Sequence, residues 1–211
     1  IKVIDESGKI IREIGGLYGG LAAISARERI IADLDAGNQL RGTKEISHSV
    51  GHCYKCGSII EPLLKEQWFV RMQPLAEAAI EALKTGKIAF EPTTKAKELA
   101  TYLAQLHDWN ISRQPAWGIP IPAFQNVNDP EDWIVDTRVE ERTIVTDGKT
   151  YRRDEDTLDT WFSSGQWPYV VTDYLSDGSL KRFFPTDLME TGSDLLRAWV
   201  SRMIMFSLYR T

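Results

Sequence analysis

The sequence predicts an α/β fold, in which strands and helices alternate and pack in layers. Two observations predict this class. About the last sixty residues alternate loop, strand and helix, and amphipathic helical spacing recurs at residues 23–34, 75–83 and 95–107. Hydrophobic residues make up 43% of the 211 residues and charged residues 26%, which is ordinary for a globular protein. This length allows one large or two small domains.

Charge and cysteine usage limit the classes of function. The net charge of −5 excludes nucleic-acid binding through overall charge, so any RNA contact needs local basic patches. The only cysteines, Cys53 and Cys56, have a spacing that suits a metal knuckle or a redox pair and indicates a reducing compartment. No signal-peptide pattern follows Ile1, and the apolar segment 195–209 is too short to span a bilayer. We expect a soluble, cytoplasmic protein and, because the chain starts without Met, a fragment of a longer one.

The first 45 residues are predicted to form the edge of a domain. Short strands at residues 2–4 and 9–11 flank a turn at residues 6–8. Residues 23–34 carry apolar side chains at helical spacing, and Ser25 is a possible cap for that helix. Residues 46–64 contain the cysteine knuckle.

Strand and helix alternate over residues 68–107. A strand at residues 68–72 leads into a helix at residues 75–83, with Pro74 at its start and Gly86 after its end. A short extended piece at residues 89–91 precedes a helix at residues 95–107. Three leucines share one face of that last helix: Leu99, Leu103 and Leu106.

Residues 109–124, WNISRQPAWGIPIPAF, contain three prolines and cannot be helical throughout. The segment is predicted to end in a strand at residues 119–124. Residues 125–153 are polar and rich in turns, which indicates a small insertion with a hairpin at Asp147 and Gly148. Further on, a buried strand at residues 188–189 is predicted to turn into a helix that begins near Leu195.

An acidic, glycine-containing corner connects that strand to that helix. Glu190, Thr191, Gly192 and Asp194 would lie at the carboxyl end of the strand, where open α/β sheets bind ligands. Gly192 permits close approach of the backbone, amides at a helix start bind anions, and a carboxylate accepts hydrogen bonds from ribose hydroxyls. The alternative is that Asp194 only caps the helix.

Three large apolar side chains accompany this corner. Leu195 and Trp199 are four residues apart and share a helix face. In DTLDTWFSSGQWPY, residues 156–169, Trp161 offers a flat face to an aliphatic group, and Ser163 and Ser164 are donors for a phosphate. Together they suggest a site for a small apolar molecule beside a ribose and a phosphate. The alternative is that these aromatic and aliphatic side chains are ordinary core.

Two further groups are candidates for function. Ser112, Arg113 and Gln114 could position neighbouring loops or contact an RNA end, and Arg113 could equally be a structural ion-pair partner. Cys53 and Cys56 are candidate zinc ligands, although a zinc knuckle needs four ligands and a second cysteine pair is absent from the sequence. An empty remnant of such a knuckle is the alternative.

Three segments, in this order, resemble the class I aminoacyl-tRNA synthetases and most closely the valyl-tRNA synthetases: DWNISRQPAWGIPIPAF, DEDTLDTWFSSGQWPY and FFPTDLMETGSDLLRAWVSRMIM. The earlier segment HSVGHCYKCGSIIEPLLKEQWFVRM is similar to the stretch in which that family returns from its editing domain to its catalytic core. The resemblance implies the second half of a Rossmann-like catalytic domain plus the tail of an inserted β-rich editing domain. It places the editing tail at residues 1–45, the knuckle and return strand at 46–72, and the partial catalytic domain at 73–211, with its insertion at 125–153.

The resemblance also implies roles for the candidate residues. The side chains that would line a valine pocket are Trp161, Leu195 and Trp199. The residues that would hold the adenosine end of ATP or of valyl-adenylate are Glu190, Thr191, Gly192 and Asp194. Ser112, Arg113 and Gln114 would support the site. The implied partners are valine, ATP with Mg²⁺ and tRNA(Val), with neither DNA nor a membrane, and zinc is left open.

Two positions favour valine within this resemblance. Isoleucyl relatives usually have Asp where Ser163 stands, and leucyl relatives usually lack the Trp of Trp161. The chain contains no HIGH-type and no KMSKS-type sequence, the two nucleotide-binding signatures of class I. We therefore expect an aminoacyl-tRNA ligase that also edits mischarged tRNA as the parent enzyme, and an inactive isolated chain.

The alternatives are an isoleucyl-tRNA synthetase fragment, or a non-catalytic module that binds RNA or protein through the knuckle and the basic stretch 84–97.

Overall fold

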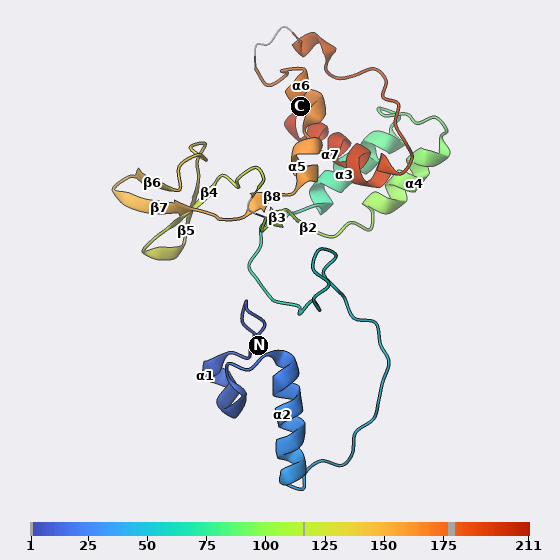
Figure 1. The fold of residues 1–211 in the computed structure, drawn as a ribbon. Coiled ribbons are helices and arrows are strands. Elements are labelled where there is room, and N and C mark those ends of the chain that lie inside the picture. The colour runs from blue at the N-terminus through green and yellow to red at the C-terminus, as the bar shows by residue number, and fades with distance from the viewer. Residues whose placement is uncertain (1, 116, 177–179) are drawn as a thin grey trace. The chain divides into compact units, whose positions relative to one another are not determined.

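The computed structural model describes residues 2–115, 117–176 and 180–211. The chain is mixed α/β, as predicted, and divides into two compact units, residues 1–66 and 67–211 (Figure 1). Ala116, within the predicted irregular segment, lies outside the described residues.

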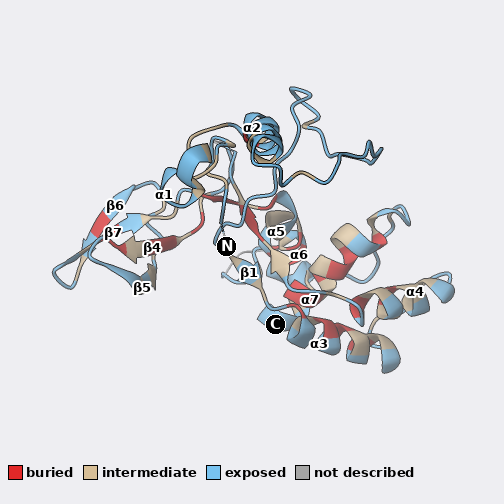
Figure 2. Cartoon of the chain, turned by 90° about the horizontal axis from the view of Figure 1, so that it is seen from below, coloured by how far each residue is buried: buried red, intermediate tan, exposed pale blue. Residues whose placement is uncertain are grey.

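The first unit contains little regular structure apart from its helices. These are α1 (Arg12–Gly15), the 3₁₀ helix η1 (Gly16–Tyr18) and α2 (Ala23–Ala36). Helix α2 confirms the predicted helix, but Ser25 does not cap it, because the N-cap position is Ala22 and makes no side-chain capping bond. The two predicted strands reduce to an isolated bridge between Ile4 and Ile10. Most of α2 is exposed, and Ala26 is its buried residue (Figure 2).

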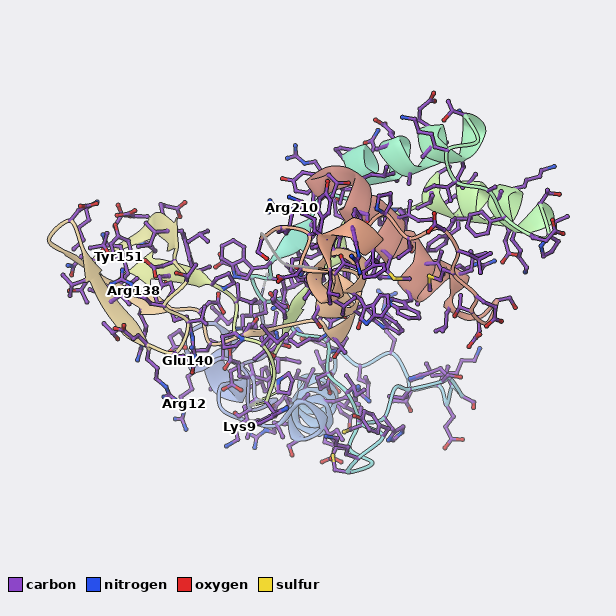
Figure 3. All side chains as sticks on the ribbon, turned by 90° about the horizontal axis from the view of Figure 1, so that it is seen from above. Lys9, Arg12, Arg138, Glu140, Tyr151 and Arg210 are labelled. Carbon is purple, nitrogen blue, oxygen red and sulfur yellow. The ribbon has the colours of Figure 1, made fainter. Side chains whose placement is uncertain are left out.

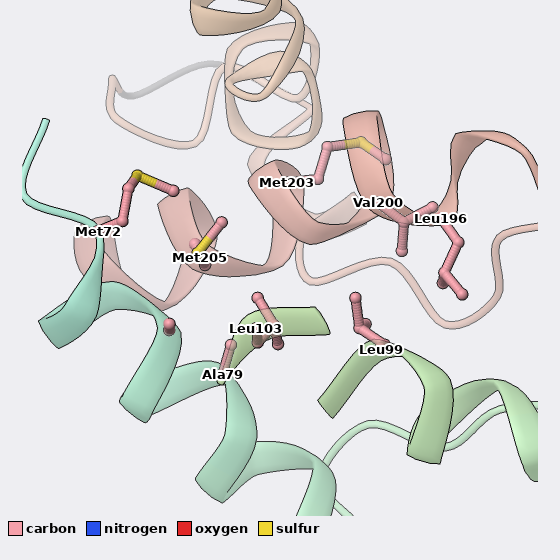
Figure 4. Packing of buried hydrophobic residues seen from close by; sticks show 9 residues of the cluster. Met72, Ala79, Leu99, Leu103, Leu196, Val200, Met203 and Met205 are labelled. Atoms are coloured by element: carbon pink, nitrogen blue, oxygen red, sulfur yellow. The ribbon is translucent and has the colours of Figure 1, made fainter. Parts of the chain in front are cut away.

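The second unit has its main core between helices. Its helices are α3 (Gln73–Lys84), α4 (Thr94–Leu103), α5 (Thr160–Ser164), α6 (Trp167–Val171), the 3₁₀ helix η2 (Lys181–Phe183), the π-helix η3 (Leu196–Val200) and α7 (Ser201–Arg210). The buried faces of α3, α4, η3 and α7 meet in one cluster (Figure 4). On α3 this face consists of alanines, which allow a close approach of the neighbouring helices.

Helices α3 and α4 follow the sequence signals closely. Pro74 lies in the first turn of α3, as predicted, and Gly86 follows its end with a φ of 73°. Leu99 and Leu103 are buried in the α4 face, and Leu106 packs against the same cluster. Helix α4 ends four residues before the predicted end at residue 107, because the chain tightens there into i→i+3 turns that lead to the next strand.

The described strands of the second unit form three small sheets. They are β1 (Phe69–Val70), β2 (Trp109–Asn110), β3 (Ser112–Arg113), β4 (Ala123–Asn126), β5 (Asp129–Val135), β6 (Thr143–Thr146), β7 (Lys149–Arg153) and β8 (Thr157–Leu158). Strands β1 and β2 form one pair, β3 and β8 a second, and the third sheet has the order β5-β4-β7-β6. The predicted strand at residues 68–72 is therefore shorter, and the one at residues 119–124 is shifted into β4.

The four-stranded sheet covers residues 125–153, the segment predicted to be an insertion. Asp147 and Gly148 connect β6 to β7 with φ values of 52° and 73°, which a two-residue type I′ hairpin requires, so the predicted hairpin is confirmed. Phe124, Ile144 and Tyr151 form a buried cluster on one face of this sheet. The sheet therefore has a small core of its own.

The predicted buried strand at residues 188–189 is absent. Leu188 is 85% exposed and Met189 43% exposed, and neither residue lies in a strand. Every strand pair among the described residues is antiparallel, so these residues form no parallel sheet. A strand needs a neighbour for its backbone groups, and no described strand pairs with this segment.

Asp132 connects three side chains of the four-stranded sheet, one of which is Tyr151 (Figure 3). It accepts hydrogen bonds from Lys149 Nζ at 2.8 Å, Asn126 Nδ2 at 2.9 Å and the Tyr151 hydroxyl at 3.1 Å. These donors, Lys149 above all, lower the pKa of Asp132 from 3.8 to about 2. A lowered folded-state pKa stabilises the fold above pH 3.8, and this stabilisation is lost as the pH falls from there to about 2.

Asp132→Asn is therefore expected to lower the urea midpoint at neutral pH and to lose its difference from the wild type near pH 2. Tryptophan fluorescence provides the measurement, because Trp133 packs edge-to-face on Trp68 with ring centroids 5.2 Å apart. Glu131→Gln, one residue away and exposed, is the matched control. An equal pH dependence of the urea midpoint in the wild type and Asp132→Asn would contradict the stabilising role of the ionised Asp132 carboxylate.

Candidate functional site

The candidate site is built around the short helix α5, which carries Trp161. Its N-cap is Asp159, whose Oδ1 accepts the backbone N–H of Trp161 at 2.7 Å. The other carboxylate oxygen of Asp159 pairs with the Arg113 guanidinium. The sequence contained a signal for this cap, since Asp directly before a short helical run is a favoured N-cap, but Asp159 was not among the predicted site residues.

An aromatic cluster holds α5 from its buried side. Phe162 packs against Phe206 at 5.4 Å and against Trp109 at 6.1 Å between ring centroids. The Arg202 guanidinium lies 4.2 Å from the Trp109 ring centroid, in a cation–π arrangement. Trp109 of β2 and Phe206 of α7 therefore hold helix α5 through its residue Phe162.

Trp199 reaches the C-terminal end of α5. Its indole N–H donates to the Ser164 carbonyl at 2.9 Å, and its ring packs edge-to-face on Trp167 at 6.3 Å. The structure thus brings Trp199 to the helix that carries Trp161, although the two residues come from separate segments. Trp161 itself is 37% exposed, and Leu195 is half-buried.

Ser163 and Ser164 do not match the role of phosphate donors in this structure. Both hydroxyls donate to the carbonyl oxygen of Thr160, each at 2.9 Å. The hydroxyl protons are therefore used inside α5, as is common for serine in helices.

Trp199 lies in a π-helical turn, which the sequence did not predict. The turn spans Leu196–Val200 and continues directly into α7. A π turn inserts a residue into the helical repeat and changes the direction of the side chains on it, and such turns are frequent at functional sites. The predicted start of the helix near Leu195 is confirmed, whereas its regular first turn is not.

The acidic corner precedes this turn. Glu190, Gly192 and Asp194 are exposed and Thr191 is half-buried. The Asp194 carboxylate folds back over Gly192 so closely that a Cβ atom on residue 192 would overlap its Oδ1. Gly192 therefore leaves room for the carboxylate, and the N-cap position of the helix is Leu195 rather than Asp194.

The predicted supporting loop contacts its neighbours through side chains. Ser112 is buried, and its hydroxyl accepts the backbone N–H of Trp68 at 2.8 Å. Gln114 Nε2 donates to Asp156 Oδ2 at 2.9 Å. These two bonds join the segment 112–114 to Trp68 and to Asp156, in addition to the pairing of β3 with β8.

A pocket of about 340 Å³ adjoins Arg113, and the sequence did not predict it. It is lined by Met72, Tyr102, Leu106, His107, Asp108, Trp109, Asn110, Arg113, Ser201, Arg202 and Met205. Trp161, Leu195 and Trp199 do not line it, so this pocket is not the one proposed for the apolar side chain, although Arg113 borders it.

The cysteine knuckle lies in the first unit. The Cys53 N–H donates to the Ser58 carbonyl at 2.8 Å, and the Gly57 N–H donates back to the Cys53 carbonyl at 2.8 Å. A hydrogen bond to Ser58 lowers the pKa of the Cys56 thiol. In the part of the chain that the structure describes, no group of three or more His, Cys, Asp or Glu could hold a metal ion. A structural zinc needs four ligands, and the described residues do not bring four such groups together.

None of the helices in residues 2–115, 117–176 and 180–211 has the length and apolar character that a membrane span requires.

Comparison with known proteins gives consistent matches along the chain. Residues 20–211 match the family described as tRNA synthetases class I (I, L, M and V). The chain is similar to the valine–tRNA ligase of Petrotoga mobilis, with 44% identity over 208 residues that cover 97% of this chain and 23% of that protein. The valine–tRNA ligase of Thermotoga maritima is 41% identical, covering 97% of this chain and 24% of its own length. That of Symbiobacterium thermophilum is 41% identical over 211 residues, covering 100% of this chain and 23% of its own length.

Proposed function

The chain belongs to the tRNA synthetases class I (I, L, M and V), and from this premise we propose that it forms part of an enzyme that activates valine with ATP and transfers it to tRNA(Val). The observation that carries the proposal is the 44% identity to a valine–tRNA ligase over 97% of the chain. The chain spans about a quarter of the length of these relatives, namely 23–24%. The activity, the substrates and the partners are therefore proposed for the whole enzyme.

In this proposal the chain contributes the second half of a Rossmann-like catalytic domain and the tail of an editing domain. The tail covers residues 1–45, the knuckle and return strand 46–72, and the catalytic part 73–211 with its insertion at 125–153. The division of the structure after residue 66 supports a change of domain in this region. A cytoplasmic location of the enzyme is part of the same proposal.

Trp161, Leu195 and Trp199 are proposed to line the valine pocket. The indole–carbonyl bond from Trp199 to Ser164 supports this, because it joins the helices on which the two tryptophans lie. An apolar pocket binds the isopropyl group through burial of its surface. Such a pocket discriminates poorly against an isostere that adds a hydroxyl, and valyl-tRNA synthetase facing threonine is a known instance of this limit. Editing of mischarged tRNA by the parent enzyme follows from the same limit.

Glu190, Thr191, Gly192 and Asp194 are proposed to hold the adenosine end of ATP or valyl-adenylate, and Ser112, Arg113 and Gln114 to support the site. ATP arrives with Mg²⁺, and the valine carboxylate attacks the α-phosphate while pyrophosphate leaves. Positioning of the two reactants, and stabilisation of the charge that develops, lower the barrier of such a step. The share of these residues is to bind and orient the two substrates.

The test is amino-acid-dependent pyrophosphate exchange by the product of the complete reading frame that encodes this chain. Exchange that depends on valine and prefers it to isoleucine supports the proposal, and a preference for isoleucine assigns the enzyme to the isoleucyl branch instead. The 211-residue chain alone is expected to be inactive, because its sequence contains neither nucleotide-binding signature. Absence of exchange with either amino acid in the complete protein would refute the proposal.

Gly192→Ala is expected to raise the KM for ATP by roughly 10- to 100-fold, the effect of losing one hydrogen bond to a charged group. The new methyl group displaces the Asp194 carboxylate from the position that Gly192 leaves open. Because that carboxylate can rotate into solvent, the melting temperature should change little. Ser193→Ala, which adds no atom at the neighbouring position, is the control. An unchanged KM for ATP in Gly192→Ala would contradict a role of Asp194 in nucleotide binding.

A further inference from the structure

We propose that Arg113 is a positioning residue for amino-acid selection: through Asp159 it sets the direction of helix α5 and therefore the place of the Trp161 side chain. This inference rests on the proposed function and deepens it, because it assigns control of the valine pocket to a residue outside the pocket wall.

The Asp159 carboxylate has one partner for each of its two oxygens. Oδ2 pairs with Arg113 Nη2, and Oδ1 accepts the Trp161 backbone N–H at 2.7 Å. The Asp159 side chain is only 8% exposed, so this carboxylate cannot exchange its partners for water at little cost. A displacement of the guanidinium is therefore passed directly to the backbone amide of Trp161 in the first turn of the helix.

Arg113 is itself fixed by the strands around it. Its Nη1 donates to the carbonyl oxygens of Ser112 at 2.7 Å and Asn110 at 3.1 Å. The Asp159 N–H donates to the Ile111 carbonyl at 2.8 Å, and Arg113 pairs with Thr157 in the register of β3 and β8. One planar guanidinium thus holds two strand carbonyls and a carboxylate, which the single ammonium of lysine cannot reproduce.

Helix α5 needs such an external hold because it is short. It has five residues, and isolated helices of this length do not form in water. Its direction is set by contacts at its two ends, Asp159 at the start and the Trp199 indole at the Ser164 carbonyl. Without Arg113 the start loses its side-chain hold and keeps the Asp159 backbone bond to Ile111, while the end remains attached to Trp199, so Trp161 changes its place relative to Trp199.

A purely structural ion pair would give a different result from a positioning one. Loss of a structural pair lowers the stability of the fold and affects all substrates alike. Loss of a positioning pair changes the fit of the amino-acid side chain and leaves ATP binding intact. The two roles are separated by comparing the KM for valine, the KM for ATP and the preference for valine over 2-aminobutyrate, which lacks one methyl group.

The experiment uses the product of the complete reading frame, in which Arg113→Met and Arg113→Lys are compared with the wild type in pyrophosphate exchange. Arg113→Met is expected to raise the KM for valine about tenfold or more, to reduce the preference for valine over 2-aminobutyrate, and to leave the KM for ATP within about twofold. Arg113→Lys should lie between the wild type and Arg113→Met. Arg138→Met is the matched control, because it removes the arginine of another Asp–Arg pair, in the loop between β5 and β6 (Figure 3).

Four outcomes would overturn the inference, and a fifth would refute the proposed function. An unchanged preference in Arg113→Met overturns the inference, and so does a parallel rise of both KM values. The same change of preference in Arg138→Met also overturns it. If Arg113→Met fails to fold, Arg113→Lys and Asp159→Asn carry the test, since both keep polar groups at the pair, and unchanged selectivity in both overturns the inference. A wild-type enzyme without valine-dependent exchange refutes the proposed function itself. This result differs from an active wild type whose preference for valine over 2-aminobutyrate is unchanged in Arg113→Met.

Discussion

Trp161→Ala is expected to raise the KM for valine by roughly 10- to 100-fold, the effect of withdrawing a large aromatic surface from a bound aliphatic side chain. The melting temperature should stay close to that of the wild type, because the indole is 37% exposed in the chain and its helix is held by Phe162, Asp159 and Ser164. Pyrophosphate exchange by the complete enzyme and thermal unfolding of the same sample provide the two measurements.

Trp117→Ala is the control for Trp161→Ala, because its indole is 92% exposed. It should alter neither measurement. If Trp161→Ala instead unfolds the protein while Trp117→Ala does not, Trp161 belongs to the core and the pocket assignment is wrong. If Trp161→Ala leaves the KM for valine unchanged, the residue faces something other than the amino acid.

Gly165→Ala is expected to destabilise the second unit by about 1–3 kcal/mol, as overpacking of a filled interior does. A Cβ atom on residue 165 would lie 2.9 Å from Phe206 Cδ2 and 3.0 Å from Arg202 Cβ, so helix α5 would have to move away from α7. For a chain of this size the melting temperature should fall by roughly 3–10 °C. All seven tryptophans lie between residues 68 and 199, so tryptophan fluorescence reports the unfolding of this unit alone.

Gly51→Ala is the matched control for Gly165→Ala. A Cβ atom there would meet Ile60 at 3.8 Å, an ordinary contact, and residue 51 belongs to the first unit. The fluorescence transition should therefore not shift in this variant. Equal melting temperatures of Gly165→Ala and the wild type would show that α5 is not pressed against α7 in solution.

The elements that sequence reasoning predicted correctly are those with local signals. Helices α2, α3 and α4 have apolar periodicity within a dozen residues, and the hairpin at Asp147 and Gly148 has residues that tolerate positive φ. The beginning of the helix at Leu195 follows from the same kind of information. The end of α4 and the cap of α2 depend on how the chain continues, and both predictions were wrong.

The features that were missed depend on partners distant in sequence. The strand at residues 188–189 was expected from its hydrophobicity, but a strand forms only beside another strand. The pair of Arg113 and Asp159 joins residues 46 positions apart, so no window along the sequence contains both. The π turn at Leu196–Val200 has no compositional signature, and it depends on the packing of the helix. The order of the motifs indicated the family, whereas the contacts between them required the structure.

Strand β4 and strand β7 lie next to each other, with Phe124 opposite Arg153, so the chain enters and leaves the four-stranded sheet at almost the same point. Because its two ends lie together, a change in the length of the segment between them is expected to leave the path of the remaining polypeptide unaltered. The tip at Asp147 and Gly148 is in consequence a suitable place to attach a fluorophore or an affinity tag. A label there would report on the enzyme while standing clear of the segments from which the pocket is proposed to be built.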